Sequence, residues 1–161
     1  LNIINNLIEK RKDIKFSSDF IIGYPGENEN DFEESLKLFK KVKFINSYSF
    51  IYSSRPGTPS SNLKEVDKLV AKSRLIRFQS LADQIKLNYR KKLINREFKV
   101  LFENRIRNEN VFFGRDEYNN SIVVESKKNI KGLIKNVEIV KINKNTLFGI
   151  LTEKKDRKFA A

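Results

Sequence analysis

The sequence contains no cysteine, histidine, methionine or tryptophan. Without cysteine the chain has no disulfide framework, which fits a reducing compartment, and no thiolate to hold an iron–sulfur cluster. Without histidine a Ser-His-Asp triad is impossible. The acidic residues fall mainly where helix starts and solvated faces favour them. The sequence therefore predicts neither a self-contained catalytic set nor a metal site.

Long apolar runs are also missing. No stretch approaches the roughly 20 apolar residues that a membrane span requires. The opening residues, Leu1-Asn2-Ile3-Ile4, do not read as a signal peptide. We therefore expect a cytoplasmic protein without membrane contact.

Positive charge is in excess, with 33 Lys and Arg against 20 Asp and Glu and a formal net charge of +13. Such a surplus draws a chain toward a polyanion, and RNA is the natural candidate. A compositional bias of the genome explains the same surplus equally well, so charge alone leaves the partner open. With 161 residues, 39% of them hydrophobic, the chain can bury one ordinary core or two small ones, and we favour two.

Residues 1–61 alternate between helix and strand patterns. Apolar residues at helical spacing predict helices over 2–12 and from the N-cap Asn28 to about residue 43. Strands are predicted over 14–22 and 47–53, and the short apolar run at 20–22 is typical of a strand covered on both faces. This order implies parallel pairing, and hence part of a parallel α/β barrel. Because two strands cannot form a barrel, we expect further strands upstream of Leu1.

Residues 62–94 are predicted to form a connecting helix. A loop rich in Ser, Pro and Gly precedes it, with Asn62 as the N-cap and Glu65 in capping-box position. No heptad is sustained, which favours a packed connector over a coiled coil. Its apolar stripe is expected to begin with Val66, Leu69 and Val70 and to continue through Leu75, Phe78, Ala82, Ile85 and Tyr89.

Residues 95–153 change to a β pattern. Five short segments, 98–103, 111–115, 121–125, 137–142 and 146–151, are separated by turn residues. Five strands in a small basic domain predict an all-β, OB-like barrel, with Phe102 and Phe112 in its core. Residues 154–161 are expected to be a charged tail.

Two of the predicted strands end in loops rich in glycine and proline. The first loop is Gly23-Tyr24-Pro25-Gly26-Glu27, and the second runs from Tyr52 to Thr58. Ligands of parallel α/β sheets bind where strands meet such loops, so the two loops outline part of a pocket. The glycines let the backbone approach a ligand, and Ile22 can present an apolar wall. The alternative is a plain tight turn, with Glu27 favouring the positive end of the next helix.

Together the two loops resemble those of the MiaB-type tRNA methylthiotransferases, which belong to the radical S-adenosylmethionine superfamily. The segment from Phe20 to Glu27 looks like the family's strand-end motif that supports the adenine of the cofactor. The resemblance covers nearly the whole chain and implies that residues 1–61 are the C-terminal portion of a radical S-adenosylmethionine domain and residues 95–153 a TRAM domain. It implies proximity to the cofactor for Asp19, Ile22, Gly23, Pro25, Glu27, Tyr52 and Ser53.

The resemblance also implies an activity for a longer parent enzyme. Members methylthiolate an N6-prenylated adenosine next to the tRNA anticodon, with S-adenosylmethionine and two [4Fe-4S] clusters. The Cys-x3-Cys-x2-Cys cluster motif is absent from this chain. We therefore expect a C-terminal part of such an enzyme, inactive alone and without catalytic residues, which binds the anticodon stem-loop as a monomer.

Four basic residues are predicted to contact RNA. In a loop of Ser, Pro and Gly, the guanidinium of Arg55 is free to fork onto phosphate or a base edge, although an ion pair with a local carboxylate is equally compatible with its position. In the barrel, basic residues interleave with aromatic ones, as in single-strand binding domains, and Arg115, Lys127 and Lys128 are the candidates there.

Two other functions remain open at this point. One is a non-enzymatic RNA-binding module, in which the two loops are only scaffold. The other is the related enzyme that methylthiolates an aspartate of a ribosomal protein. The segment Arg55-Pro56-Gly57-Thr58 favours the tRNA enzymes over that relative.

Overall fold

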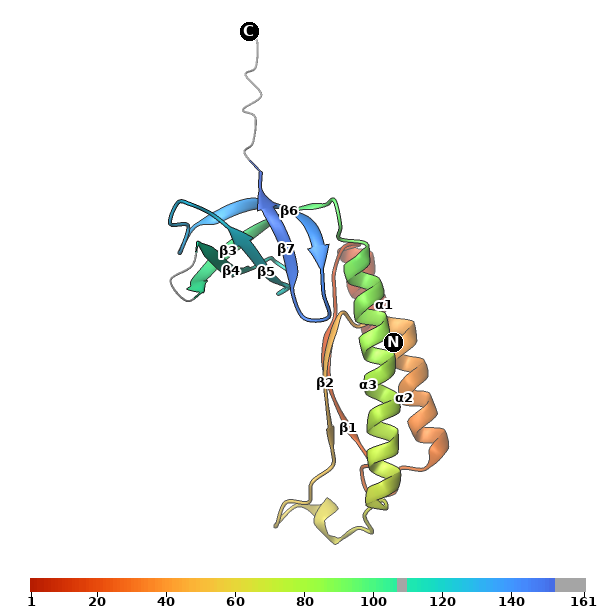
Figure 1. Cartoon of the computed structure of the whole chain (residues 1–161). Helices are drawn as coiled ribbons and strands as arrows, with labels where there is room; N and C mark the ends of the chain where they lie inside the picture. The colour runs from red at the N-terminus through yellow and green to blue at the C-terminus, as the bar shows by residue number, and fades with distance from the viewer. Residues whose placement is uncertain (107–109, 153–161) are drawn as a thin grey trace. The chain divides into compact units, whose positions relative to one another are not determined.

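The computed structural model describes residues 1–106 and 110–152. The chain divides into two compact units, Leu1–Lys86 and Leu87–Ala161, whose elements are labelled in Figure 1. Each unit is described by itself. The predicted charged tail, 154–161, lies outside the described residues. Among the helices of the described part, none is both long and apolar enough to cross a membrane.

The first unit alternates helices and strands in the predicted order. It contains α1 (Asn2–Lys10), β1 (Ser17–Ile22), α2 (Glu29–Val42) and β2 (Asn46–Ile51). β1 and β2 pair in parallel, with Ile22 opposite Ile51 at their carboxyl ends, so the predicted parallel pairing is confirmed. A 3-10 turn, η1 (Pro59–Asn62), and the long helix α3 (Lys68–Lys91) follow.

Helix α2 begins where the sequence predicted. The side chain of Asn28 accepts a hydrogen bond from the Asp31 amide at 3.1 Å, and the Asp31 carboxylate accepts one from the Asn28 amide at 3.0 Å. This capping box satisfies two amides that the first helical turn leaves without partners. At the other end Lys43 takes a left-handed conformation, with φ of 58°, and stops the helix.

Helix α3 begins later than predicted, and the expected cap at Asn62 is wrong. Asn62 belongs to the 3-10 turn that Pro59 opens. The cap is Asp67, whose Oδ1 accepts hydrogen bonds from the amides of Leu69 at 2.9 Å and Val70 at 3.2 Å. Leu69 and Val70 are also exposed rather than part of the stripe. The buried stripe begins instead at Ala71.

The core of the first unit is an aromatic cluster between the sheet and two helices. Helices α2 and α3 lie on the same side of the strands (Figure 1). The Phe78 ring of α3 lies 4.7 Å from that of Phe20 in β1 and 5.0 Å from that of Phe39 in α2. Three further stripe residues predicted on α3 pack against this cluster, namely Leu75, Ala82 and Ile85.

The other face of the sheet is not covered by the described chain. Ile21, Tyr48 and Phe50 are 59%, 62% and 55% exposed. The expectation that β1 is covered on both faces is therefore wrong for Ile21 within the described chain. Successive strand residues point to opposite faces, so Phe20 and Ile22 reach the helices while Ile21 points away from them.

The second unit is a closed barrel of five strands. These are β3 (Glu97–Ile106), β4 (Val111–Arg115), β5 (Ser121–Glu125), β6 (Ile134–Ile142) and β7 (Leu147–Leu151). Their order around the barrel is β3-β4-β5-β7-β6, and β6 pairs back onto β3. Four pairings are antiparallel, and β5 with β7 is parallel. All five predicted strands are confirmed.

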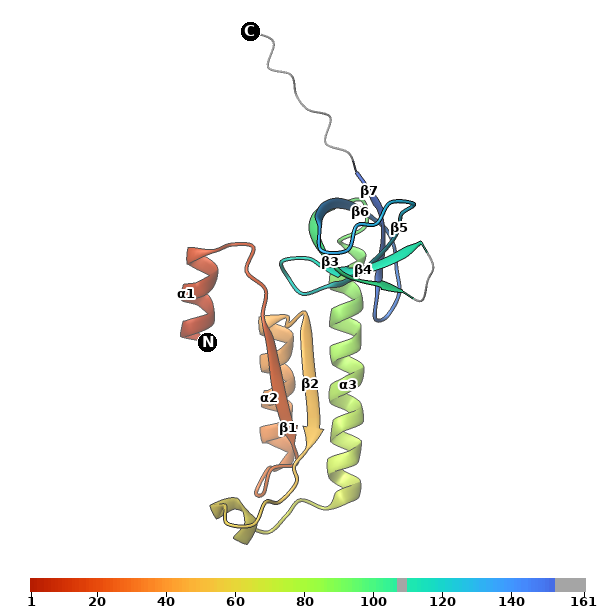
Figure 2. The same cartoon turned by 90° about the vertical axis from the view of Figure 1, so that its left-hand side faces the viewer.

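The barrel interior is filled by alternate residues of its strands, as the sequence predicted. Phe102 and Phe112 are buried at its centre, with exposures of 0% and 1%. Val100, Val137 and Ile139 are among their neighbours in the core, and Tyr89 packs against the same core. The strands that enclose this interior are labelled from a second direction in Figure 2.

Phe78→Ala tests the aromatic cluster. Loss of this fully buried ring is expected to lower the free energy of unfolding of the first unit by about 4 kcal/mol, because a cavity remains among its neighbours. Ile76→Ala, on the exposed side of α3, is the control and should cost no more than about 0.5 kcal/mol. Urea denaturation followed by far-ultraviolet circular dichroism measures both. Equal effects of the two changes contradict the packing described.

Candidate functional site

The two glycine-proline loops meet at one edge of the sheet. The Tyr52 amide donates a hydrogen bond to the Ile22 carbonyl at 2.8 Å, which extends the pairing of β1 and β2 into the loops. The rings of Tyr24 and Tyr52 lie edge to face with centroids 5.2 Å apart. The predicted meeting of the two strand ends is therefore confirmed.

The first loop is a tight turn held shut by its own glutamate. The Gly23 amide donates to Glu27 Oε2 at 3.0 Å, and the Glu27 amide donates to the Tyr24 carbonyl at 2.9 Å. Gly23 has a φ of +73°, and a Cβ at this position would lie 2.8 Å from that of Ala71. Both facts exclude a side chain at Gly23, so α3 passes directly behind the loop.

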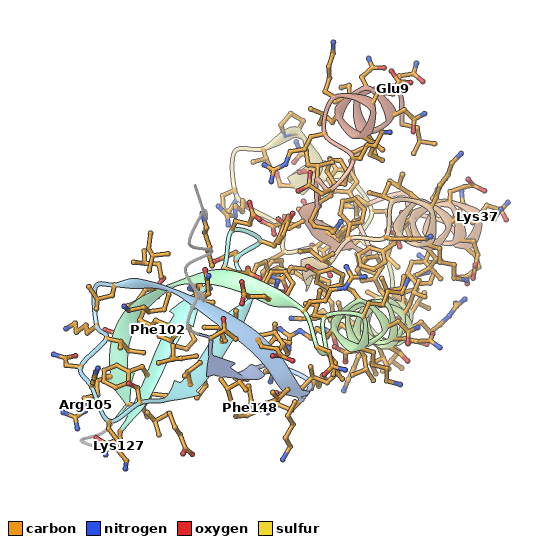
Figure 3. All side chains as sticks on the ribbon, turned by 90° about the horizontal axis from the view of Figure 1, so that it is seen from above. Glu9, Lys37, Phe102, Arg105, Lys127 and Phe148 are labelled. Atoms are coloured by element: carbon orange, nitrogen blue, oxygen red, sulfur yellow. The ribbon has the colours of Figure 1, made fainter. Side chains whose placement is uncertain are left out.

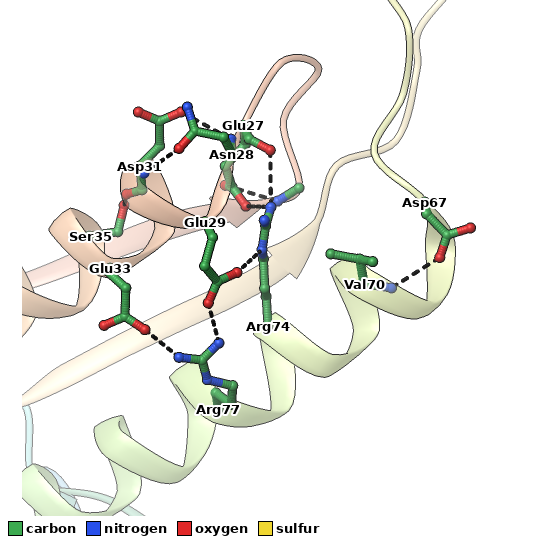
Figure 4. Close-up of polar contacts among 11 residues, drawn as sticks. Glu27, Asn28, Glu29, Asp31, Glu33, Ser35, Asp67, Val70, Arg74 and Arg77 are labelled. Carbon is green, nitrogen blue, oxygen red and sulfur yellow. Dashed lines mark hydrogen bonds and ion pairs between the residues drawn. The ribbon is translucent and has the colours of Figure 1, made fainter.

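A buried arginine of α3 fixes this loop from behind, as Figure 4 shows. The Arg74 side chain is only 7% exposed. Its Nη1 donates to the Glu27 carbonyl oxygen at 3.0 Å and to Glu27 Oε1 at 2.9 Å, and its Nε donates to Glu29 Oε2 at 3.1 Å. Since Glu27 also bonds Gly23, one guanidinium holds both ends of the loop. Charge-assisted bonds of this kind are stronger than neutral ones.

A second arginine continues the network toward solvent. Arg77 Nη1 donates to Glu29 Oε1 at 2.5 Å, and its Nη2 donates to Glu33. The hydrogen bond from Arg77 holds the pKa of Glu29 below its ordinary value, and Arg74 adds to this shift while desolvation opposes it. The hydrogen bond to Glu29 likewise raises the pKa of Arg77. The two arginines thus join α3 to the first turn of α2.

The sequence interpretation missed Arg74 and Arg77. A signal was present for Arg74, because it falls on the buried stripe of α3, three residues after Ala71 and four before Phe78. A basic residue at an apolar position of a helix indicates a buried ion pair. For Arg77 no such signal exists, because its side chain is 45% exposed.

The structure places the predicted cofactor residues in three environments. In the loops, Tyr52 is half-buried and the Glu27 side chain is only 11% exposed, while Gly23 and Pro25 are buried. Asp19 and Ser53 are exposed, Asp19 on the uncovered face of the sheet. Ile22 is 1% exposed and packs in the aromatic core. The expected apolar wall is therefore not formed by Ile22, and Ile21 is the exposed apolar side chain beside it.

The predicted RNA residues also differ in their surroundings. Arg55, Lys127 and Lys128 are exposed, and the described part of the chain offers no ion-pair partner to the Arg55 guanidinium within 4 Å. Arg115 is more restrained than expected: it lies 3.4 Å from the Glu103 carboxylate and donates to Asn119 Oδ1 at 3.0 Å. Arg55 lies in the first unit and the other three in the barrel.

The geometry defines a class of protein: an α/β unit in which two glycine-proline loops meet at the carboxyl ends of parallel strands, followed in the chain by a small closed barrel. No protein-family model matches the chain. Curated relatives do, and they carry the name tRNA-2-methylthio-N(6)-dimethylallyladenosine synthase. The protein of Pelagibacter ubique (strain HTCC1062) is 48% identical over 149 residues, which is 91% of this chain and 33% of the relative.

Two further relatives with this name give the same result. The protein of Wolbachia pipientis subsp. Culex pipiens (strain wPip) is 40% identical over 92% of this chain and 34% of its own length. That of Ehrlichia chaffeensis (strain ATCC CRL-10679 / Arkansas) is 37% identical over 94% of this chain and 35% of its own length. The chain is therefore similar, over nine-tenths of its length, to the MiaB-type tRNA methylthiotransferases, as its loops indicated. It spans about a third of the length of the curated relatives it matches.

Arg74→Met tests whether the buried guanidinium of Arg74 holds the first loop in place. The change removes the charge but keeps an unbranched apolar side chain, and it leaves the largely buried Glu27 carboxylate uncompensated, so the free energy of unfolding should fall by about 3 kcal/mol. Hydrogen exchange at the Gly23 amide should accelerate as well. Arg77→Met, a matched change one turn along, should affect both much less. If Arg74→Met leaves the free energy of unfolding and the exchange rate unchanged, the Arg74 guanidinium does not stabilise the loop.

The ionisation of Glu29 can be measured directly by carboxyl-carbon NMR titration. A pKa below the ordinary value near 4.5 means that the fold favours the charged form. The resulting stabilisation is present above that value and is lost as the pH falls through the folded pKa. Arg77→Ala should move the Glu29 pKa back up. Lys37→Ala, which removes the Glu34 ion pair instead, should leave it in place, and an unmoved pKa in Arg77→Ala contradicts the assignment.

Proposed function

We propose that the chain is the C-terminal third of a tRNA methylthiotransferase that modifies an N6-prenylated adenosine next to the anticodon. The observation that carries this proposal is the similarity, at 36% to 48% identity, to synthases of that name over nine-tenths of the chain. The two loops brought together at one sheet edge support it, because that is where ligands of parallel α/β sheets bind.

In this proposal the two loops form one wall of the S-adenosylmethionine site. The Tyr52 hydroxyl supports the fit: it is buried and finds no hydrogen-bond partner among the described residues, so it is available to a ligand. The exposed Ile21 and the Tyr24 ring supply apolar surface beside it. Gly23, Pro25, Glu27 and Ser53 shape the same sheet edge, and Asp19 lies on the uncovered face of β1. When bound, S-adenosylmethionine supplies the radical and methyl chemistry.

The residues of this chain do not fit the two [4Fe-4S] clusters of the proposed enzyme. The sequence has no cysteine, and among residues 1–106 and 110–152 no group of three His, Cys, Asp or Glu residues could hold a metal ion. No step of the reaction is therefore assigned to a cluster on these residues. The chain alone should be inactive. Its contribution to the whole enzyme is to orient S-adenosylmethionine and to bind RNA.

The barrel is assigned to RNA in this proposal. Its first strand pairs with the second and the fourth, and its third pairs in parallel with its fifth, an arrangement that supports an OB-like TRAM barrel. The exposed Lys127 and Lys128 suit phosphate contacts, as does Arg55 on the second loop. We assign the anticodon stem-loop as the partner of a monomeric, cytoplasmic enzyme.

A chimeric enzyme tests the proposal. The matching third of the Pelagibacter ubique protein is replaced by this chain, and the chimera is expressed in a bacterial strain that lacks its own methylthiotransferase. Mass spectrometry of tRNA nucleosides should detect the methylthiolated, prenylated adenosine. This chain expressed alone in the same strain, without the remaining two-thirds of the enzyme, should yield none.

The outcomes separate the candidate functions. A folded chimera that leaves tRNA unmodified contradicts the proposal, provided that the unaltered Pelagibacter ubique protein is active in the same strain. A chimera that leaves tRNA unmodified but methylthiolates an aspartate of a ribosomal protein identifies the related enzyme instead. Activity of this chain alone contradicts its assignment as a cluster-free part.

A further inference from the structure

Two phenylalanines of the barrel lie outside its core. Phe113 in β4 and Phe148 in β7 are half-buried and are not among the side chains that fill the interior. Their strand neighbours Phe112 and Leu147 are buried in that interior. Since side chains alternate along a strand, the two phenyl rings are directed to the outer surface of the barrel.

The strand register places these rings in one row. Phe113 is paired with Val123 of β5, and Val123 is paired in turn with Phe148 of β7. Paired residues of neighbouring strands point to the same face. Two strand spacings, roughly 10 Å, separate the two phenylalanine positions. The outer surface therefore carries a stacking row of Phe113, Val123 and Phe148, with one aromatic ring at each end.

The backbone beneath the row is fixed by two glycines. Each phenylalanine is followed by one, Gly114 and Gly149. A Cβ on Gly114 would lie 2.4 Å from the Leu101 carbonyl oxygen, and one on Gly149 would lie 2.3 Å from Val137 Cγ1. Neighbouring strands pass so closely at these points that no inward side chain fits. The two rings thus stand on a closely packed part of the barrel.

Positive charge flanks both rings. The Arg115 guanidinium lies over the Phe113 ring, 5.3 Å from its centroid. Lys141 of β6 is exposed and paired with Phe148. The described residues of 87–152 include thirteen Lys and Arg but only six Asp and Glu. This excess of positive charge favours an anionic ligand on the barrel.

We propose that the stacking row binds two unpaired bases of single-stranded RNA, one on each phenylalanine, with Arg115 and Lys141 beside the adjoining phosphates. This inference rests on the proposed function and adds the part of the RNA that the barrel reads. Aromatic rings on a rigid barrel, next to guanidinium and ammonium groups, are how single strands are held without a preference for sequence. A duplex has no free base faces to offer to these rings.

The stacking row is separate from the lysines predicted from sequence. Figure 3 shows Phe148 well away from Lys127. The lysine pair contributes charge to the same strand of RNA, and the row contributes stacking. The two contributions respond differently to salt, because only phosphate contacts release counterions.

Binding of the whole chain to a short labelled oligouridine, and to an RNA duplex of equal length, tests the inference. Oligouridine should bind more tightly than the duplex, because its bases are unpaired. Phe113→Leu with Phe148→Leu should weaken oligouridine binding by about tenfold for each ring, with an unchanged slope of log affinity against log salt. Lys127→Ala with Lys128→Ala should instead reduce that slope by about 0.7 for each phosphate that the lysines no longer neutralise.

Two control variants keep the result interpretable. Phe113→Tyr with Phe148→Tyr retains both rings and should keep the affinity. Ile134→Ala removes an exposed apolar side chain of β6 away from the row and should have no effect. The inference is overturned if the leucine variant binds oligouridine as tightly as the unaltered chain. It is also overturned if the tyrosine variant loses as much affinity as the leucine variant, because both rings are still present in the tyrosine variant.

The same measurements distinguish this inference from the proposed function. If the unaltered chain binds RNA and the leucine variant is unaffected, the stacking row is wrong while the methylthiotransferase assignment stands. If the unaltered chain binds no RNA, the stacking row is wrong, and the chimera assay decides the methylthiotransferase assignment independently.

Discussion

The candidate site depends on the hydrogen bonds that the buried guanidinium of Arg74 donates to Glu27 and Glu29. It bonds the carboxylate and the carbonyl of Glu27 at once and reaches Glu29 through its Nε. Glu27 in turn closes the first loop on Gly23. A buried charge is costly unless it is paired and hydrogen-bonded, and for Arg74 the partners are supplied by the loop itself and by the first turn of α2. The loop cannot move without uncovering that charge.

Helix α3 also explains why the first loop requires glycine at position 23. Gly23 lies against Ala71, one turn before Arg74 on the same helix, and has no room for a side chain. Helix α3 therefore supplies both the steric wall and the charge behind the first loop. The position of the second loop is fixed in turn, because the Tyr52 amide donates a hydrogen bond to the Ile22 carbonyl at the start of the first loop. In this way one helix face determines the position of both loops.

Much of the fold could be predicted from the sequence, because local signals were strong. The capping residue Asn28 and the alternation of the barrel strands each had one clear interpretation. The start of α3 was mispredicted because Asn62 and Asp67 are both good caps, and only the 3-10 turn opened by Pro59 excludes the first. Ile21 and Ile22 were not distinguished, because a short apolar run does not show which alternate residue faces the helices.

The meeting of the two loops was predictable from the sequence, but the contacts that hold them in place were not. Two strand ends with glycine and proline indicate where a ligand would bind. The partners of Arg74 lie 45 and 47 residues away in the chain, and no local pattern connects them. For Arg115 the restraint by Glu103 depends on the pairing of β3 with β4, and a β-bulge in β3 shifts that register.

The most direct test of this dependence is the proximity of the two loops in solution, measured as nuclear Overhauser effects between the rings of Tyr24 and Tyr52. The structure predicts clear cross-peaks in the unaltered chain, where the centroids are 5.2 Å apart, and their loss when Arg74 is replaced by methionine in a chain that remains folded. Cross-peaks that persist without the guanidinium, or that are missing with it, contradict the central role of Arg74.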